Sequence, residues 1–237
     1  MKNPYGIKNG NLVTVDSVEK GLACGCTCPA CGEPLEAHKG NIKNHYFKHC
    51  SGADCGYGLE SAAHLFAKEC IERKKILLLP SLKATPNWDE LTYLKSQYLD
   101  QRPFDHSVMF KDVVKPWHKL KIDSVVLEKR IGRIVPDVVI VAKGRELLVE
   151  IKVTHGIDEE KHSYIVNNNL SVVEYDFSSM RSREDFEKIE SALTVTYKGA
   201  KKGKGLGRWV NHLGLEKAKN EVTEAMRVRY PDLPKNQ

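Results

Sequence analysis

The chain has 237 residues, enough for one large domain or for a domain with a small added module. About 41% of the residues are apolar and 29% are charged, which is typical of a globular protein and excludes a disordered one. The 37 basic and 31 acidic residues leave a net charge of +6, a bias too mild to establish a polyanionic partner. The longest apolar run, Val138 to Ala142, is too short to span a bilayer, so no membrane partner is expected.

Six of the seven cysteines lie between residues 24 and 55. The first ten residues contain no apolar core followed by a small-residue cleavage site, so we expect no export signal and a cytoplasmic location. In such a reducing compartment, clustered thiols are better explained as metal ligands than as disulfides.

The predicted elements form a mixed α/β pattern. The first helix, over residues 59–73, has an apolar stripe at helical spacing and an adjacent polar row of Glu60, His64 and Lys68. His64 has a plain explanation there as a partner of Glu60 on the same helix face. Residues 87–98 are compatible with a helix or with an irregular insertion. The remaining expected elements are strands at 12–15, 75–82, 120–129, 133–142, 145–154 and 170–177, and helices at 158–168, 183–193 and 213–228, with Asp158 and Ser182 as N-caps.

The hairpin around residues 137–152 carries the most informative polar residues. Lys143 and Gly144 form its predicted turn, which places Asp137 opposite Glu150. Glu150 and Lys152 share one face because side chains alternate along a strand. Two acids in an apolar hairpin are costly to bury unless they are paired or metal-bound, and their oxygens suit Mg²⁺ or Mn²⁺. The plainer explanation is a solvated cross-strand salt bridge.

Together these segments resemble the competence protein CoiA-like nucleases of the PD-(D/E)xK superfamily. The resemblance covers about residues 24 to 178. It is carried by Cys28-Pro-Ala-Cys31-Gly-Glu, Phe47-Lys-His49, Cys55, Glu60-Ser-Ala-Ala-His64, Pro136-Asp137, Glu150-Ile151-Lys152 and Leu170 to Asp176.

The resemblance implies a restriction-endonuclease-like αβββαβ core that cuts a nucleic acid, with DNA expected, using Mg²⁺ or Mn²⁺. Asp137, Glu150 and the carbonyl of Ile151 would bind the metal, and Lys152 would position the attacking water. Glu60 would complete or tune the site. The expected organisation is a zinc-binding module at 1–57, a nuclease core at 58–180 and a basic helical extension at 181–237. The sequence leaves the oligomeric state open, a homodimer included.

The Cys/His cluster predicts a structural zinc site. Cys28 and Cys31, two residues apart and followed by a glycine, can wrap around one tetrahedral ion. Two pairings complete the site equally well by spacing: His45 with His49, or His49 with Cys55. The resemblance implies the second, a Cys₃His site, although Tyr46 stands where the family often has a histidine. Cys24 and Cys26 are interpreted as bystanders and Cys70 as a core residue.

A basic stretch follows the predicted core. It has four glycines and no acid, and its cations are Lys198, Lys201, Lys202, Lys204 and Arg208. Such a loop can follow a phosphate backbone, and Tyr197 and Trp209 could stack on bases. The plainer explanation is a solvated loop.

Two functional hypotheses follow from these features. The first is a Mg²⁺-dependent deoxyribonuclease of the PD-(D/E)xK type. The alternative is a catalytically inactive, zinc-containing nucleic-acid-binding protein on the same scaffold. A cleavage assay separates them, because only the first predicts strand breaks.

Overall fold

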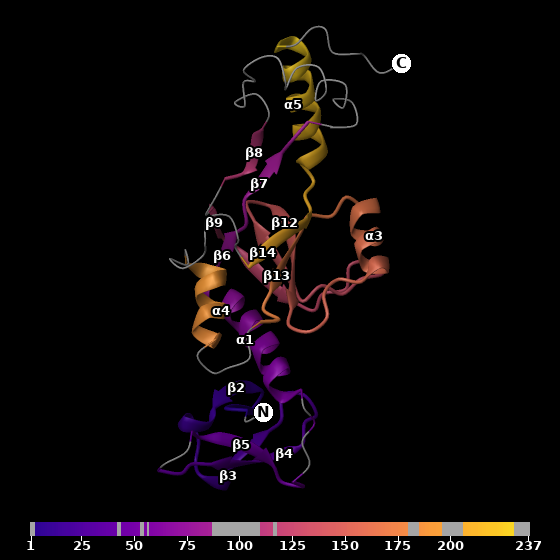
Figure 1. Cartoon of the computed structure of the whole chain (residues 1–237). Helices are drawn as coiled ribbons and strands as arrows, with labels where there is room; N and C mark the ends of the chain where they lie inside the picture. The colour runs from indigo at the N-terminus through magenta and orange to yellow at the C-terminus, as the bar shows by residue number, and fades with distance from the viewer. Residues whose placement is uncertain are drawn as a thin grey trace.

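The computed structural model describes residues 3–41, 44–52, 55, 57–86, 110–115, 118–179, 185–195 and 206–229. Three parts follow one another along the molecule in Figure 1: a small N-terminal sheet, a central α/β unit and an arm that ends in helix α5. The expectation of a mixed α/β fold is confirmed.

The N-terminal module is a five-stranded antiparallel sheet in the order β2-β1-β3-β4-β5. Its core is small, and three of its seven buried apolar side chains are cysteines: Cys24, Cys26 and Cys28. A short 3-10 helix at Val15–Ser17 follows the second strand. The strands are β1 (Tyr5–Lys8), β2 (Asn11–Thr14), β3 (Gly21–Thr27), β4 (Pro34–His38) and β5 (Tyr46–His49).

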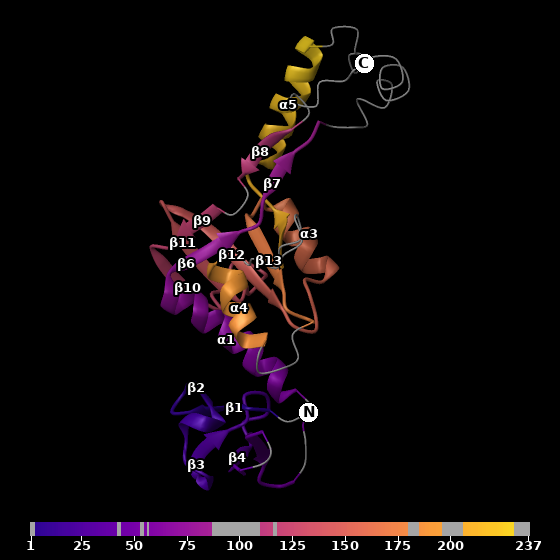
Figure 2. The same cartoon turned by 60° about the vertical axis from the view of Figure 1, so that its left-hand side comes forward.

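Helix α1 (Gly58–Lys74) leads from this module into the central unit, as Figures 1 and 2 show. The helix predicted over 59–73 is therefore confirmed. Its apolar stripe, from Ala62 to Ile71, is buried in the main core. The helix ends where Lys75 takes a left-handed conformation with φ of 52°.

The central sheet has five strands in the order β10-β11-β12-β13-β14. The first three form an antiparallel meander, β12 and β13 are parallel, and β14 is antiparallel to β13. Helix α3 (Glu159–Asn167) makes the crossover between the parallel strands. The strands are β10 (Ser124–Leu127), β11 (Val138–Ala142), β12 (Arg145–Lys152), β13 (Val172–Asp176) and β14 (Gly207–Asn211).

Helices cover both faces of this sheet. Alternate residues of β12 pack on opposite sides: Val149 lies in the large core with α1 and α4 (Asp185–Thr194), whereas Leu148 packs with Ile165 of α3. Figure 1 shows the same layers, with α1 and α4 on one side of the strands and α3 on the other. By this alternation, Glu150 and Lys152 share the face of Leu148.

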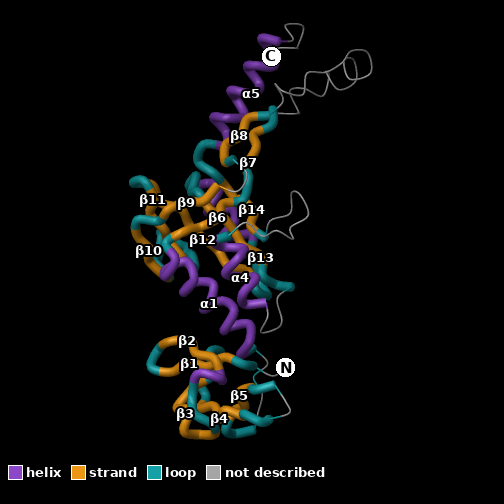
Figure 3. Tube along the Cα trace, turned by 90° about the vertical axis from the view of Figure 1, so that its left-hand side faces the viewer, coloured by secondary structure: helices purple, strands orange, loops and turns teal. Residues whose placement is uncertain are grey.

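The arm is built from a two-stranded ribbon and a helix. Strands β7 (Leu82–Ala84) and β8 (Lys111–Val114) pair with each other, and Ala84 packs with Ala218 and Val222 of α5 (Leu215–Arg229). Figures 2 and 3 show these elements at the end of the molecule opposite the N-terminal module. A second ribbon, β6 (Ile76–Leu79) with β9 (His118–Lys121), connects the arm to the central unit.

Several predicted elements need correction. The single strand expected at 75–82 is two strands separated by Pro80 and Ser81, and the strand expected from residue 133 begins only at Val138. Strand β14 begins at Gly207, so it overlaps the last two residues of the stretch interpreted as a basic loop. Residues 87–98 and the proposed cap Ser182 lie outside the described residues. In chain order, the central unit reads α1, β10, β11, β12, α3, β13, with the two ribbons inserted after α1.

Candidate functional site

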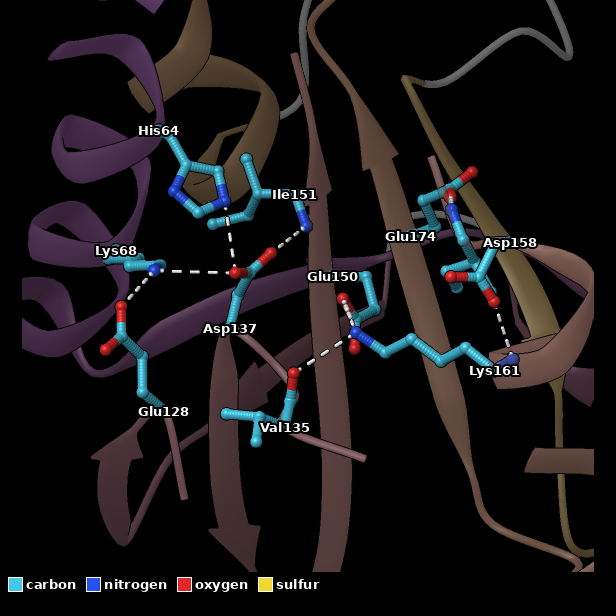
Figure 4. A network of polar contacts seen from close by, with 11 residues as sticks. His64, Lys68, Glu128, Val135, Asp137, Glu150, Ile151, Asp158, Lys161 and Glu174 are labelled. Carbon is cyan, nitrogen blue, oxygen red and sulfur yellow. Dashed lines mark hydrogen bonds and ion pairs between the residues drawn. The ribbon is translucent and has the colours of Figure 1, made fainter. Parts of the chain in front are cut away.

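A cavity of about 230 Å³ opens beside the ends of β11, β12 and β13, near the start of α3. The hairpin prediction holds here, because Asp137, Glu150 and Lys152 all line this cavity. The register pairs Val138 with Val149, which puts Asp137 and Glu150 next to each other at the end of the hairpin. Lys143 and Gly144 both have positive φ, as the predicted tight turn requires. Figure 4 shows the polar side chains around this cavity.

Both oxygens of Asp137 have partners. The backbone N–H of Ile151 donates to Oδ2 at 2.8 Å, and Nε2 of His64 lies 3.0 Å from Oδ1. The ammonium of Lys68 lies 3.4 Å from the same Oδ1. Burial alone would raise the pKa of Asp137, but the contacts with His64, Ile151 and Lys68 outweigh it and lower that pKa. Asp137 is therefore a carboxylate at neutral pH.

Lys68 is a buried cation of α1, with only 5% of its side chain exposed. Besides Asp137 it binds Glu128, donating to Oε1 at 2.8 Å. A buried ammonium is stable only with such partners, so Lys68 joins the central helix to the acidic end of the hairpin. Figure 4 shows this chain of contacts from Glu128 through Lys68 to Asp137.

Glu150 is the other acid of the pair and is more deeply buried. Its side chain is 8% exposed, and Oε2 accepts a hydrogen bond from Nζ of Lys161 at 2.8 Å. Its other oxygen, Oε1, is buried and has no hydrogen-bond partner among the residues that the structure describes. Burial raises the pKa of Glu150 to about 7, although Lys161 opposes the shift. A buried carboxylate oxygen without a partner is costly unless a proton or a cation occupies it.

Lys152 follows Glu150 on the same sheet face, but its ammonium binds a different acid. Nζ lies 2.7 Å from Oδ2 of Asp176 on the neighbouring strand. The contact with Asp176 raises the pKa of Lys152, which is therefore a permanent cation at neutral pH. It can donate hydrogen bonds to a water or a phosphate but is a poor proton acceptor.

Glu174 on β13 forms the far wall of the cavity and is 2% exposed. Its Oε1 accepts from the N–H of Ile157 at 3.1 Å, and its Oε2 accepts from Nε of Arg208 at 2.7 Å. These bonds tie the loop between β12 and α3 to the sheet. Arg208 was predicted to contact nucleic acid; it is paired with this buried acid, and 62% of its side chain is exposed.

Other predicted residues have different surroundings. Glu60 is half-buried on α1 and is not among the residues that line the cavity. His64, one helical turn further on, contacts Asp137 instead. Trp209, predicted to stack on bases, donates from Nε1 to the carbonyl of Pro80 at 2.9 Å and packs against the main core. Lys198, Lys201, Lys202 and Lys204 lie outside the described residues.

A second candidate site is the group Cys28, Cys31, His49 and Cys55, which could hold a structural metal such as zinc. One ligand atom from each residue lies within 4.8 Å of all the others. The Sγ atoms of Cys28 and Cys55 are 3.7 Å apart, and Sγ of Cys31 is 3.3 Å from Nε2 of His49. A tetrahedral ion with zinc–sulfur bonds of about 2.3 Å requires edges of about 3.8 Å, so the group is close to the size needed.

The sheet of the N-terminal module assembles this group from three segments. Cys28 and Cys31 lie in the turn between β3 and β4, which Gly32 closes by donating from N to the Cys28 carbonyl at 2.9 Å. His49 ends β5 and pairs in register with Leu35 of β4. Burial raises the pKa of Cys28 to about 11, and the N–H of Ala30, 3.4 Å from its Sγ, opposes that shift.

The alternative ligand His45 belongs to another network. Its Nδ1 is 2.6 Å from Oδ1 of Asp16, and its Nε2 is 3.2 Å from the carbonyl of Gly40. Both ring nitrogens are thus occupied away from the cysteines, which selects the pairing of His49 with Cys55. Cys24 and Cys26 are buried in the module core outside the group, as expected of bystanders.

No protein-family model, curated protein or solved structure matches this chain. Among the helices that the structure describes, none is long and apolar enough to cross a membrane.

Proposed function

We propose that this protein is a divalent-metal-dependent nuclease of the PD-(D/E)xK type that hydrolyses phosphodiester bonds in DNA. The observation that carries the proposal is the unpartnered Oε1 of Glu150, buried beside Asp137 in the wall of a cavity. A hard cation held by both carboxylates would satisfy that oxygen.

The fold supports the same proposal. The chain order α1, β10, β11, β12, α3, β13 has the αβββαβ pattern expected of a restriction-endonuclease-like core. The two acids lie at the adjoining ends of β11 and β12, where the resemblance to the CoiA-like nucleases requires them. The proposal includes a structural zinc ion held by Cys28, Cys31, His49 and Cys55.

Asp137, Glu150 and the carbonyl of Ile151 are the groups that would hold the catalytic Mg²⁺ or Mn²⁺. Such a cation lowers the pKa of a bound water and stabilises negative charge on the phosphate. The donor set fits it, because two carboxylates and a carbonyl are all oxygen ligands and one carboxylate oxygen is unpartnered.

The cations of the cavity would bind and orient the substrate. The pKa of Lys152 is raised by Asp176, so this lysine holds a water or a phosphate oxygen by donation rather than removing a proton. The guanidinium of Arg208 is exposed and bonded to Glu174 of the cavity wall, so it could also meet a phosphate of a bound nucleic acid.

Cleavage of single-stranded, double-stranded and branched DNA, with RNA alongside, tests the proposal in the presence of Mg²⁺ or Mn²⁺. Asp137→Asn, Glu150→Gln and Lys152→Ala should each lower the rate at least about 100-fold, because each removes a group that holds the metal or the water. DNA affinity should change little. The matched control is Glu146→Gln, which alters an exposed acid on the same strand, paired with Lys129.

Wild-type-like cutting by Glu150→Gln would refute the site. DNA binding without cleavage under any of these conditions would instead identify the protein as an inactive nucleic-acid-binding relative on the same scaffold.

A further inference from the structure

A lysine outside the predicted signature is bonded to one acid of the pair, Glu150. Lys161 lies in the first turn of α3, where its own N–H donates to Oδ1 of the cap residue Asp158 at 2.7 Å. Its ammonium donates to Oε2 of Glu150 at 2.8 Å and to the carbonyl of Val135 at 3.2 Å. Lys161 thereby joins helix α3 to both strand ends that carry the acids, as Figure 4 shows.

The other buried carboxylate oxygens around the cavity already have partners. Asp137 uses Oδ1 for His64 and Lys68 and Oδ2 for the N–H of Ile151. Glu174 uses Oε1 for the N–H of Ile157 and Oε2 for Arg208. Glu150 differs from both, because Lys161 occupies one oxygen and no other residue in the described part of the chain bonds to the second.

The charges favour one added cation over two. Lys161 and Arg208 bind Glu150 and Glu174, and Lys68 is shared between Asp137 and Glu128. One divalent ion would supply the two positive charges that offset a phosphodiester and a hydroxide. A second ion on Oε2 of Glu150 would compete with an ammonium that is already 2.8 Å away.

We propose that Lys161 is the positioning residue of the acid pair: it holds Oε2 of Glu150 and leaves Oε1 to bind a single divalent cation. The inference rests on the proposed metal-dependent function. It adds that the site binds one divalent ion per chain and that the ammonium of Lys161 orients the ligand Glu150. Lys152 cannot take this role in the arrangement seen, because its ammonium is bonded to Asp176.

Titration of the zinc-loaded full chain with Mn²⁺, followed by calorimetry or by paramagnetic resonance, tests the inference without any cleavage. The wild type should bind one Mn²⁺ per chain, and Glu150→Gln should abolish that binding. Lys161→Met should weaken it by about tenfold or more, as expected when the group that orients a metal ligand is lost. Lys161→Arg, which keeps a cation there, should restore most of the affinity.

Two matched variants separate this role from a general effect of charge. Lys152→Met removes the neighbouring cavity lysine, and Lys129→Met removes a surface lysine paired with Glu146. Lys129→Met should bind Mn²⁺ within about threefold of the wild type, because its charge lies at the surface and is screened. Lys152→Met should lose clearly less affinity than Lys161→Met, because the ammonium of Lys152 is bonded to Asp176 and not to Glu150.

Three results would overturn the inference: no Mn²⁺ bound by the wild type, two ions that both depend on Glu150, or unchanged binding by Lys161→Met. If Lys161→Met does not fold, the number of Mn²⁺ ions bound per wild-type chain still tests the inference. A chain that binds one Mn²⁺ through Glu150 and Lys161 but cuts no nucleic acid would refute the proposed function and leave this inference standing.

Discussion

At the scale of single residues, Glu150 shows how a candidate metal ligand lowers the stability of the protein that carries it. Its side chain is 8% exposed and has one unpartnered oxygen, and burial raises its pKa to about 7 from an ordinary value of 4.5. Between these two pH values the folded protein binds more protons at this position than the unfolded chain does. The free energy of unfolding therefore falls as the pH rises through this window.

The first prediction concerns Glu150→Gln with zinc bound and no other divalent cation added. Glutamine has no charge to lose, so the variant should be more stable than the wild type by roughly 2 kcal/mol at pH 8. The difference should shrink as the pH is lowered towards 5.5, where the wild-type carboxyl is protonated. Urea unfolding of both proteins at several pH values measures this difference.

The exposed pair of Glu146 and Lys129 provides the control for that experiment. Glu146→Gln removes an exposed carboxyl from the same strand, so it controls for the loss of an acid as such. Added Mg²⁺ or Mn²⁺ should stabilise the wild type and not Glu150→Gln, since only the wild type offers the carboxylate. A constant difference between Glu150→Gln and wild type across the pH range would show that Glu150 is not held protonated by burial.

At the scale of secondary structure, strong local patterns predicted the elements that carry the candidate site. The run of Val and Ile in β11 and the turn at Lys143 and Gly144 fix the hairpin register, and the register places Asp137 beside Glu150. The strict alternation of a strand also put Glu150 and Lys152 on one face. These features depend on neighbours in the sequence, so the sequence contains enough information to predict them.

Contacts between distant segments could not be predicted in the same way. Strand β14 begins at the end of a glycine-rich basic stretch, and its pairing with β13 and the bond from Trp209 to Pro80 make it a strand. The sequence showed the polar row on α1 but not which member faces the sheet, and the structure places His64 rather than Glu60 at Asp137. No role could be assigned to Lys161 from the sequence, because the packing of α3 decides its distance from Glu150.

The second prediction concerns the start of α3, which determines where Lys161 lies. Asp158→Ala removes the side-chain acceptor of the Lys161 N–H and should lower stability by about 1 kcal/mol. It should also weaken Mn²⁺ binding, because the first turn that carries Lys161 would fray. Asp158→Asn, which can still cap the helix, should keep both properties near wild type.

Thermal unfolding and Mn²⁺ titration of the two Asp158 variants measure these effects. If Asp158→Asn weakened Mn²⁺ binding as much as Asp158→Ala, the charge of Asp158 and not its capping bond would be what the cavity needs.

At the scale of the whole molecule, the N-terminal module and the central unit share a packed junction. The ring of Tyr5 stacks on that of Phe186 with centroids 3.9 Å apart, and Tyr5 belongs to the same core cluster as α1 and β12. The N–H of Leu12 donates to Oε1 of Glu69 on α1 at 3.3 Å. Loss of order in the module would therefore remove packing from the helix that carries His64 and Lys68.

The last prediction compares two exposed cysteines of the module, one inside and one outside the candidate metal group. Cys31 belongs to the candidate metal group and Cys50 does not. Cys31→Ser should lower the zinc content of the purified protein and its melting temperature together, because the small core of the module cannot replace a lost metal. Cys50→Ser, equally conservative and equally exposed, should leave both unchanged.

Elemental analysis and hydrogen exchange on the two serine variants distinguish a structural metal from an incidental one. In Cys31→Ser, amide protection should fall first in β3, β4 and β5, while β11 and β12 stay protected because their hydrogen bonds lie in the larger core. Equal zinc contents in the two variants, or a wild type without zinc, would exclude a structural metal at this group. Simultaneous loss of protection in β11 and β12 would mean that the metal stabilises the central unit through the Tyr5 junction as well.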